Sequence, residues 1–245
     1  MAKKVLFVVE GGKDENNLII KAFKRVMELS KEDVVVVRYK TVIYDLYDRL
    51  SSGEYDSLVD YLWVCHRNIF KGEFAKPRDC FSSIYLIFDF DSQDQRFSID
   101  KCEWLIRYFS DETKNGKLYF NYPMVESLLD FNSFSQNQFN NKTVSRKNLK
   151  GDTYKKKVAK NSLIMNNLMK YSLKNNKILH DVIFLHLNKY EYLCGVSIND
   201  PVIDSLALLN AELIFYRNNK VSIINSSILL LCDYNIDIIK GLSGK

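Results

Sequence analysis

The chain has 245 residues, of which 47% are hydrophobic and 27% are charged, with 9 Gly and 3 Pro. This composition is typical of a globular protein and excludes a disordered or collagen-like chain. The longest apolar runs, such as residues 228–232, are too short to cross a bilayer, so we expect no membrane partner. The formal net charge of +5 is modest, and it is unevenly distributed along the chain.

The cysteines and the N-terminus indicate the compartment. The 5 Cys are odd in number and widely spaced, without a Cys-x-x-Cys pair. This pattern is typical of reduced thiols rather than of a disulfide framework or a zinc site. The N-terminus leads directly into an expected strand, so we expect no signal peptide. The sequence therefore predicts a cytoplasmic protein.

Apolar β-type runs alternate with helical patterns over residues 1–131. Strands are expected at residues 4–9, 34–37, 84–88 and 117–120. Helices are expected at residues 14–29, 43–50, 55–70 and 99–109, and from residue 124 onward. Strands without polar alternation are typical of parallel sheets buried on both faces. We therefore expect an α/β domain with a mostly parallel sheet flanked by helices and right-handed crossovers.

The composition changes after residue 131. Residues 132–152 are rich in Asn, Ser, Gln and Lys, which predicts a mobile basic loop. Residues 153–245 are expected to form a mainly helical C-terminal lobe, with helices at about 153–175, 178–194 and 201–217. The apolar runs at 221–224 and 229–231 fit either a strand pair or a strand and a helix.

Acidic residues follow two of the predicted strands. Glu10 ends the first strand, and Asp89 and Asp91 come directly after the third. Ligands of open α/β sheets bind beyond the carboxyl ends of the strands, so we expect these three side chains to lie together. Carboxylate oxygens are the ligands that Mg²⁺ and Mn²⁺ prefer. The alternative is that these acids cap helices or solubilise the edge of the sheet.

Glu126 follows the next strand and would complete a second metal site at the same edge. A carboxylate in the first turn of a helix, stabilised by the helix dipole, explains the same residue equally well. The sequence does not decide between one metal ion and two.

A basic segment follows the α/β region. Residues 142–177 contain eleven Lys and Arg against Asp152 alone, which suggests a polyanionic partner. Tyr154 and Tyr171 would be available to stack on bases. The alternative is a solvated helix face. The expected nucleic-acid contacts are Lys142, Arg146, Lys147, Lys150, Lys155, Lys156, Lys157 and Lys160.

The strand-end glutamate followed by a glycine, with a later strand-end Asp-x-Asp, resembles the Toprim domain of primases, topoisomerases and OLD-family nucleases. Glu10 and Gly11 carry the first half of the resemblance, and Asp89 with Asp91 carries the second. The resemblance covers about residues 1–131. Residues 115–127 are similar to the corresponding stretch of RloB- and AbiL-like Toprim proteins from bacterial defence loci.

The resemblance implies a Mg²⁺- or Mn²⁺-dependent nuclease that cleaves RNA, including tRNA, or DNA. Glu10 would be a metal ligand or a general acid/base, and Asp89 and Asp91 would be metal ligands. It also implies an antiphage or abortive-infection effector with toxic activity. No nucleotide-binding loop is visible in the sequence, so any ATP hydrolysis would belong to an ABC- or AAA-type ATPase partner. A homodimer is compatible with the apolar helices near residues 178–187 and 205–215.

Two other functions are consistent with parts of the sequence. The first is a catalytically inactive, Toprim-like binding or regulatory subunit. The second is a HAD-type phosphohydrolase built on Asp89 and Asp91. The HAD pattern requires Thr or Val at the position of Gln93, and its nucleophilic Asp normally follows the first strand of the core.

Overall fold

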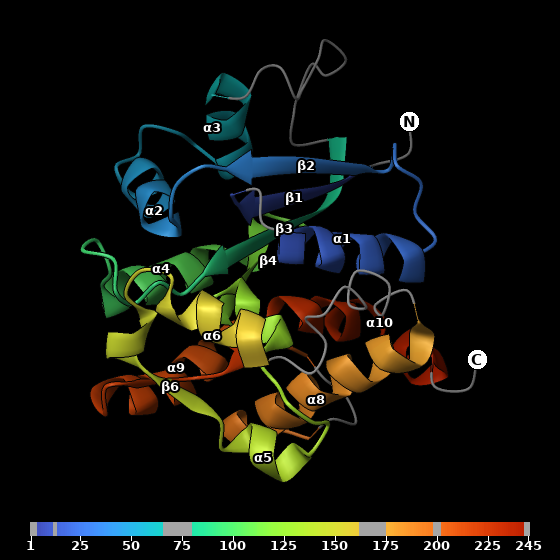
Figure 1. The fold of residues 1–245 in the computed structure, drawn as a ribbon. Coiled ribbons are helices and arrows are strands. Elements are labelled where there is room, and N and C mark those ends of the chain that lie inside the picture. The colour runs from blue at the N-terminus through green and yellow to red at the C-terminus, as the bar shows by residue number, and fades with distance from the viewer. Residues whose placement is uncertain (1–3, 12–13, 66–79, 162–174, 198–201, 243–245) are drawn as a thin grey trace.

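The computed structural model describes residues 4–11, 14–65, 80–161, 175–197 and 202–242 (Figure 1). The strands are β1 (Lys4–Glu10), β2 (Val34–Tyr39), β3 (Phe81–Asp89), β4 (Ser110–Asp111), β5 (Gly116–Tyr122), β6 (Thr143–Ser145), β7 (Lys220–Ser222) and β8 (Ile224–Asn225). The α-helices are α1 (Asp14–Val26), α2 (Ile43–Ser51), α3 (Leu58–Cys65), α4 (Ile99–Tyr108), α5 (Gln136–Asn140), α6 (Thr153–Asn161), α8 (Asn176–Cys194), α9 (Ser205–Arg217) and α10 (Leu230–Gly241). Short 3-10 helices are η2 (Val125–Leu129), η3 (Arg146–Leu149) and η4 (Ser227–Leu229).

The main sheet is mixed and mostly parallel. Its strands lie in the order β2-β1-β3-β5-β4, and β8 also pairs with β5. The pairs β1–β2, β1–β3 and β3–β5 are parallel, whereas β4 and β8 pair with β5 in antiparallel register. The predicted α/β class with a mostly parallel sheet and flanking helices is confirmed.

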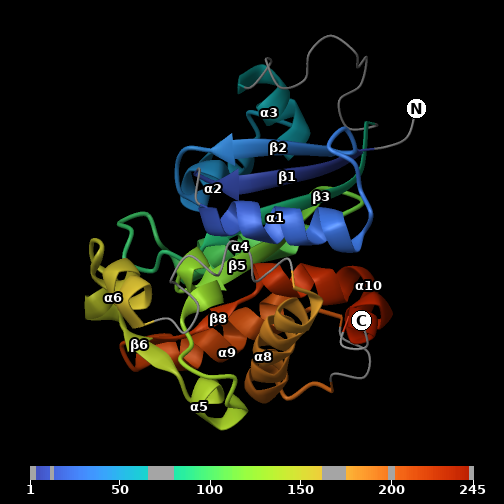
Figure 2. The ribbon, with the colours of Figure 1, turned by 45° about the vertical axis from the view of Figure 1, so that its right-hand side comes forward.

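The order of the strands creates a switch point between β1 and β3. The chain moves from β1 outward to β2, then returns across β1 to β3 and continues in the other direction to β5. Right-handed crossovers then place α1 on one face of the sheet and α2 and α4 on the other, as Figures 1 and 2 show. The carboxyl ends at such a switch point open a crevice where ligands of α/β proteins bind.

Buried aromatic side chains attach these layers to the sheet. The ring of Phe7 on β1 packs edge-on against that of Phe23 on α1, with the centroids 5.3 Å apart. On the other face, the hydroxyl of Tyr44 on α2 donates a 2.5 Å hydrogen bond to the carbonyl oxygen of Phe90, just after β3. Helices on both faces are therefore anchored to the two central strands.

Several predicted elements differ in extent or type. The helix expected from residue 124 is the 3-10 helix η2, and the strand expected at 117–120 extends over Gly116–Tyr122. The expected helix at 153–175 is described over Thr153–Asn161, and residues 162–174 lie outside the described residues. The ambiguous runs near the C-terminus become β7, β8, η4 and the start of α10.

The mobile loop predicted at 132–152 is instead a sequence of short elements, α5, β6 and η3. β6 pairs with β7 from the far end of the chain. The ammonium group of Lys189 on α8 donates hydrogen bonds to the carbonyl oxygens of Phe139 (2.9 Å) and Lys142 (2.7 Å). The sequence did not indicate these short elements because their partners are distant in the chain, and a polar composition alone does not reveal them.

The sheet also extends across the lobe boundary predicted at residue 131. β8 pairs with β5 through Asn121 with Asn225 and Tyr122 with Ile224 (Figure 2). One continuous buried cluster includes Phe7 of β1 and Leu230 of α10. The C-terminal region, which is mainly helical in its described part, therefore completes the sheet rather than standing apart from it.

Candidate functional site

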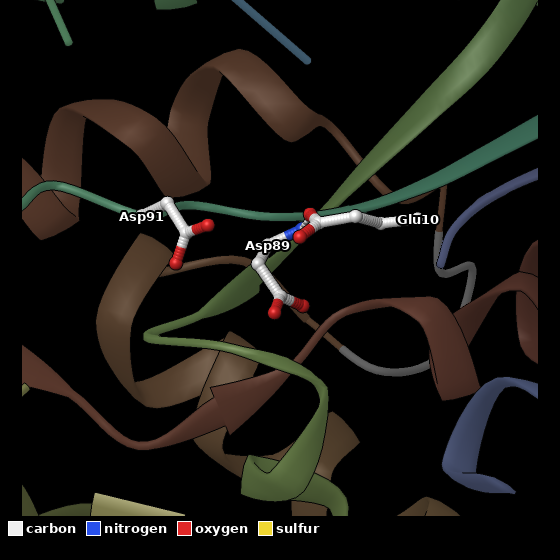
Figure 3. A group of neighbouring side chains, drawn as sticks. All are labelled: Glu10, Asp89 and Asp91. Carbon is white, nitrogen blue, oxygen red and sulfur yellow. Dashed lines mark hydrogen bonds between the residues drawn. The ribbon is translucent and has the colours of Figure 1, made fainter. Parts of the chain in front are cut away.

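Three carboxylates meet at the carboxyl ends of β1 and β3. Glu10 is the last residue of β1, Asp89 is the last residue of β3, and Asp91 follows two residues later. One oxygen from each carboxylate lies within 4.8 Å of the others. Asp89 lies between Glu10 and Asp91 in Figure 3. The structure thus brings together the three acids that the sequence singled out.

Backbone amides orient two of the carboxylates. The amide of Asp89 donates a 3.0 Å hydrogen bond to Oε2 of Glu10, which joins β1 to β3 beyond their last paired residues. The amide of Val125, the first residue of η2, donates a 2.8 Å hydrogen bond to Oδ1 of Asp89. Asp89 is only 2% exposed, and hydrogen bonds of this kind offset the cost of burying a carboxylate. Both side chains are therefore held in defined positions.

Asp91 lies outside the strand, on a turn. Its φ of +39° is in the left-handed region, which Asp adopts more readily than most residues. The side-chain amide of Gln93 donates a 2.8 Å hydrogen bond to Oδ1 of Asp91, and the amide of Asp94 donates to its carbonyl oxygen at 2.9 Å. This turn directs the Asp91 carboxylate toward the other two acids (Figure 3).

The donor set of this cluster fits a hard divalent cation. Mg²⁺ and Mn²⁺ prefer oxygen ligands, and Mg²⁺ is commonly held by one or two carboxylates together with water and substrate phosphate. Each carboxylate has two oxygens, so a hydrogen bond that orients one oxygen is compatible with metal ligation by the same group. Glu10, Asp89 and Asp91 are the residues that would hold such an ion.

Glu126 does not join this cluster. In the part of the chain that the structure describes, the group of acids within 4.8 Å contains Glu10, Asp89 and Asp91 but not Glu126. Glu126 lies on η2, where one of its oxygens is 3.7 Å from Nζ of Lys155 on α6. One carboxylate oxygen of Glu126 thus pairs with Lys155, and a second metal site at Glu126 stays a prediction.

The predicted nucleic-acid contacts separate into two groups. Three of them contact other parts of the protein: Lys142 forms an ion pair with Asp130, Arg146 donates to the carbonyl oxygen of Ser92, and Lys155 pairs with Glu126. The other five side chains are exposed, namely Lys147, Lys150, Lys156, Lys157 and Lys160. The exposed group lies on η3, on α6 and between them, and both ribbon views place α6 on the side toward which β1 and β3 point (Figures 1 and 2).

The structure does not support base stacking by Tyr154. Its side chain is completely buried on the inner face of α6, with Val158 one turn further on. Burial raises the pKa of the Tyr154 hydroxyl well above its ordinary value, and the charges of Asp130, Glu126 and Asp89 add to the effect. Tyr154 belongs to the core because it lies on the apolar stripe of an amphipathic helix. Tyr171 lies outside the described residues.

Some residues that shape the site were not identified from the sequence. The amide of Val125 has no sequence signature, because any residue except proline supplies one. Gln93 was considered only as a departure from the HAD pattern, although its position two residues after Asp91 places an amide within reach of that carboxylate. The carbonyl oxygen of Ser92 accepts a hydrogen bond from Arg146, and the sequence gives no signal for this contact either.

Comparisons of the chain with protein-family models, with curated proteins and with solved structures gave no match. None of the helices in the described part of the chain is long and apolar enough to cross a membrane. The functional argument therefore depends on the geometry of the site and on the residues that surround it.

Proposed function

We propose that the chain is a divalent-metal-dependent nuclease of the Toprim type that cleaves phosphodiester bonds in RNA or DNA. The observation that carries the proposal is the convergence of Glu10, Asp89 and Asp91 within 4.8 Å at the switch point of the sheet. The proposal also agrees with the chain order of the motifs, in which the glutamate ends β1 and the two aspartates follow β3.

The chemistry assigned to the site follows from its donors. A divalent ion bound there would neutralise charge that develops on the phosphate and lower the pKa of the attacking water. Glu10 and Asp89 are oriented by backbone amides, so little reorganisation is needed when they bind a ligand. Asp91, which lies in the turn after β3, supplies the third carboxylate of the cluster. Glu10 would act as a metal ligand or would accept a proton from a water held at the cluster.

A polyanionic substrate is supported by the exposed lysines. Lys156, Lys157 and Lys160 are exposed on α6. This helix lies on the side of the molecule where the strands end (Figure 2). Phosphate contacts from such side chains increase affinity without reading sequence. A defence role with an ATPase partner is suggested by the sequence resemblance and remains a prediction.

Cleavage assays with matched variants test the proposal. Labelled tRNA, single-stranded RNA and duplex DNA are incubated with Mg²⁺, Mn²⁺ or EDTA. We expect metal-dependent cleavage that falls about a hundredfold or more in Glu10→Gln and Asp89→Asn, because each loses an ionised group that takes part in the chemistry. The amide oxygen of either variant still accepts the existing backbone hydrogen bond, so the fold should be retained. Asp100→Asn, at an exposed acid of α4, is the control and should retain activity.

Two outcomes would contradict the nuclease assignment. One is cleavage that persists in EDTA or in Glu10→Gln. The other is wild-type protein that binds Mn²⁺ and nucleic acid but cleaves none of the substrates, either alone or when expressed in cells. The second outcome would favour the catalytically inactive binding subunit.

A further inference from the structure

Arg146 contacts the turn that carries Asp91. This turn, residues 90–97, is called the Asp91 turn below. Nη2 of Arg146 donates a 3.2 Å hydrogen bond to the carbonyl oxygen of Ser92, the residue immediately after Asp91. The contact joins η3 to the end of β3 across 54 residues of sequence.

The same guanidinium lies on an aromatic ring. Its central carbon is 4.0 Å from the centroid of the Tyr216 ring on α9. Tyr216 in turn packs against Phe97, at the end of the Asp91 turn, with the ring centroids 5.1 Å apart. Arg146 and Tyr216 therefore contact the turn at both of its ends.

On its N-terminal side the Asp91 turn is held through Phe90, whose amide donates to the carbonyl oxygen of Asn121 and whose carbonyl oxygen accepts from the hydroxyl of Tyr44. On the C-terminal side of Asp91, the contact to Ser92 comes from Arg146. β3 ends at Asp89, so the parallel ladder does not extend to Asp91. The left-handed conformation of Asp91 is also less favourable than a helical or extended one, although Asp adopts it more readily than most residues. The hydrogen bonds from Gln93 and Asp94 to Asp91 are local and move with the turn. A strained turn keeps one conformation only where the surrounding structure holds it.

We infer that Arg146, supported by Tyr216, is a positioning residue that holds the Asp91 turn so that the Asp91 carboxylate faces Glu10 and Asp89. The inference rests on the proposed function of these three acids and replaces the phosphate contact that the sequence predicted for Arg146. Only arginine combines the two interactions. Its planar guanidinium stacks on the ring while an edge N–H donates to the carbonyl oxygen, and a lysine ammonium does not have this geometry.

The half-buried position of Arg146 is consistent with this role. The side chain of its neighbour Lys147 is exposed, whereas the guanidinium of Arg146 lies between Tyr216 of α9 and Ser92 of the Asp91 turn. A residue whose guanidinium contacts a backbone oxygen and a ring is less available to a phosphate than an exposed lysine. Lys147→Ala is therefore the control, because it removes a positive charge at the neighbouring position of η3 without touching the contacts of Arg146.

The experiment compares Arg146→Lys and Tyr216→Leu with Lys147→Ala and the wild type. Hydrogen exchange is measured at the amides of Asp94 and Phe97, which donate hydrogen bonds within the turn. Mn²⁺ affinity is measured by calorimetry without nucleic acid. We expect faster exchange at both amides in Arg146→Lys and Tyr216→Leu, and Mn²⁺ affinity lower by roughly tenfold to a hundredfold, as for other residues that orient metal ligands. Lys147→Ala should match the wild type in both measurements.

Kinetics distinguish positioning from substrate binding. Arg146→Lys keeps the charge, so we expect a lower kcat with little change in KM for nucleic acid. The inference is overturned if Arg146→Lys has wild-type exchange and wild-type Mn²⁺ affinity. Failure of the wild type to bind Mn²⁺ would contradict the proposed function instead. In that case the exchange measurements, which need no metal, decide alone whether Arg146 holds the turn.

Discussion

Asp89 is a buried carboxylate that depends on a backbone hydrogen bond. Its side chain is almost completely buried, yet the proposed chemistry needs an ionised carboxylate. Burial of an unpaired carboxylate is strongly unfavourable. The amide of Val125 supplies a hydrogen bond at 2.8 Å, and a bound cation would supply opposite charge. The orientation of the Asp89 carboxylate therefore depends on the position of η2 as well as on β3, the strand that Asp89 ends.

At the same scale, His186 is a neutral histidine in the core. Its side chain on α8 is fully buried, and Nδ1 accepts a 3.1 Å hydrogen bond from the amide of Asn225 on β8. Burial lowers the pKa of His186 to about 3, and the nearby charge of Lys189 acts in the same direction. Protonation of Nδ1 would also remove the hydrogen bond to Asn225. His186 is thus a structural residue whose neutral form the fold requires.

This assignment predicts a pH dependence of stability. The unfolded chain takes up a proton at His186 near pH 6.5, whereas the folded protein resists protonation until about pH 3. The contribution of neutral His186 to the free energy of unfolding is therefore complete above pH 6.5, and it is lost as the pH falls from 6.5 toward 3. We expect this residue to add a slope of about 1.4 kcal/mol per pH unit to the free energy of unfolding in that window. Urea denaturation at pH 7.5, 6.5, 5.5 and 4.5 measures the slope.

His186→Asn is the matched variant for this measurement. The asparagine oxygen can accept the hydrogen bond from Asn225 but does not titrate. The variant should be less stable at pH 7.5 because it fills the site less well, and its stability should depend less steeply on pH between 6.5 and 4.5. Carboxylates contribute equally to both proteins, so parallel pH profiles would show that His186 does not titrate in the manner expected.

At the scale of single elements, α6 separates structural from solvent-facing residues within three turns. Tyr154 and Val158 are buried four residues apart on one face. Lys156, Lys157 and Lys160 are exposed on the other, and Lys155 lies between the two faces next to Glu126. From the sequence alone, these lysines belong to one basic segment, residues 142–177, and Tyr154 and Val158 lie within it. Helical periodicity distinguishes the faces only once it is known which side contacts the protein.

The exposed lysines of α6 are predicted to bind the phosphate backbone. Combined substitution of Lys156, Lys157 and Lys160 by Ala should weaken nucleic-acid binding and reduce the slope of log affinity against log salt concentration by about three, one for each lost contact. Thermal stability should be preserved, because alanine favours helix and these side chains are exposed. Binding is measured in EDTA at several salt concentrations, so that metal chemistry does not contribute.

Net charge must be controlled in this experiment. Combined substitution of Lys21, Lys31 and Lys177, which are also exposed, removes the same charge from other parts of the surface. This control should retain most of the affinity and the salt slope of the wild type. An equal loss in both triple variants would mean that overall charge, and not α6, drives binding.

At the scale of the whole molecule, the C-terminal region completes the main sheet. β8 pairs with β5, and the hydroxyl of Ser227 donates a 2.9 Å hydrogen bond to the buried side chain of Asn121 on β5. Asp233 of α10 accepts hydrogen bonds from Lys117 and Tyr119 on the same strand. These contacts cover the face and the end of β5 that a separate N-terminal domain would expose.

A fragment of residues 1–131 is therefore expected not to fold on its own. Without β8 and α10 it would expose Tyr119 and Tyr122, which are fully buried in the complete chain, and leave the pairing groups of Asn121 and Lys117 without partners. Exposure of several buried core side chains at once is a large loss for a domain that is only marginally stable. Near-ultraviolet circular dichroism and urea denaturation should show no cooperative transition. A monomeric fragment that unfolds cooperatively would show that the N-terminal region is an independent domain.

The sequence by itself determined the α/β class, the four parallel strands and the three acids at their ends. Strong apolar runs specify buried strands, and the carboxyl ends of parallel strands necessarily share an edge. It did not reveal β6 and did not separate β7 from β8 within the run at 221–224, because strands of three and two residues carry little local pattern and depend on their partners. Nor could it separate Lys142, Arg146 and Lys155 from the exposed lysines around them.

Only the tertiary structure decided which charged groups face the acids, which face solvent and which hold the fold together. The physical reason is that a charged side chain takes its role from what lies within a few ångströms of it. Arg146 contacts Ser92 and Tyr216, which lie 54 residues before it and 70 residues after it in the chain. Periodicity and composition describe neighbours along the chain, whereas the cluster of three acids, the Asp91 turn and its contacts with Arg146 are made by neighbours in space.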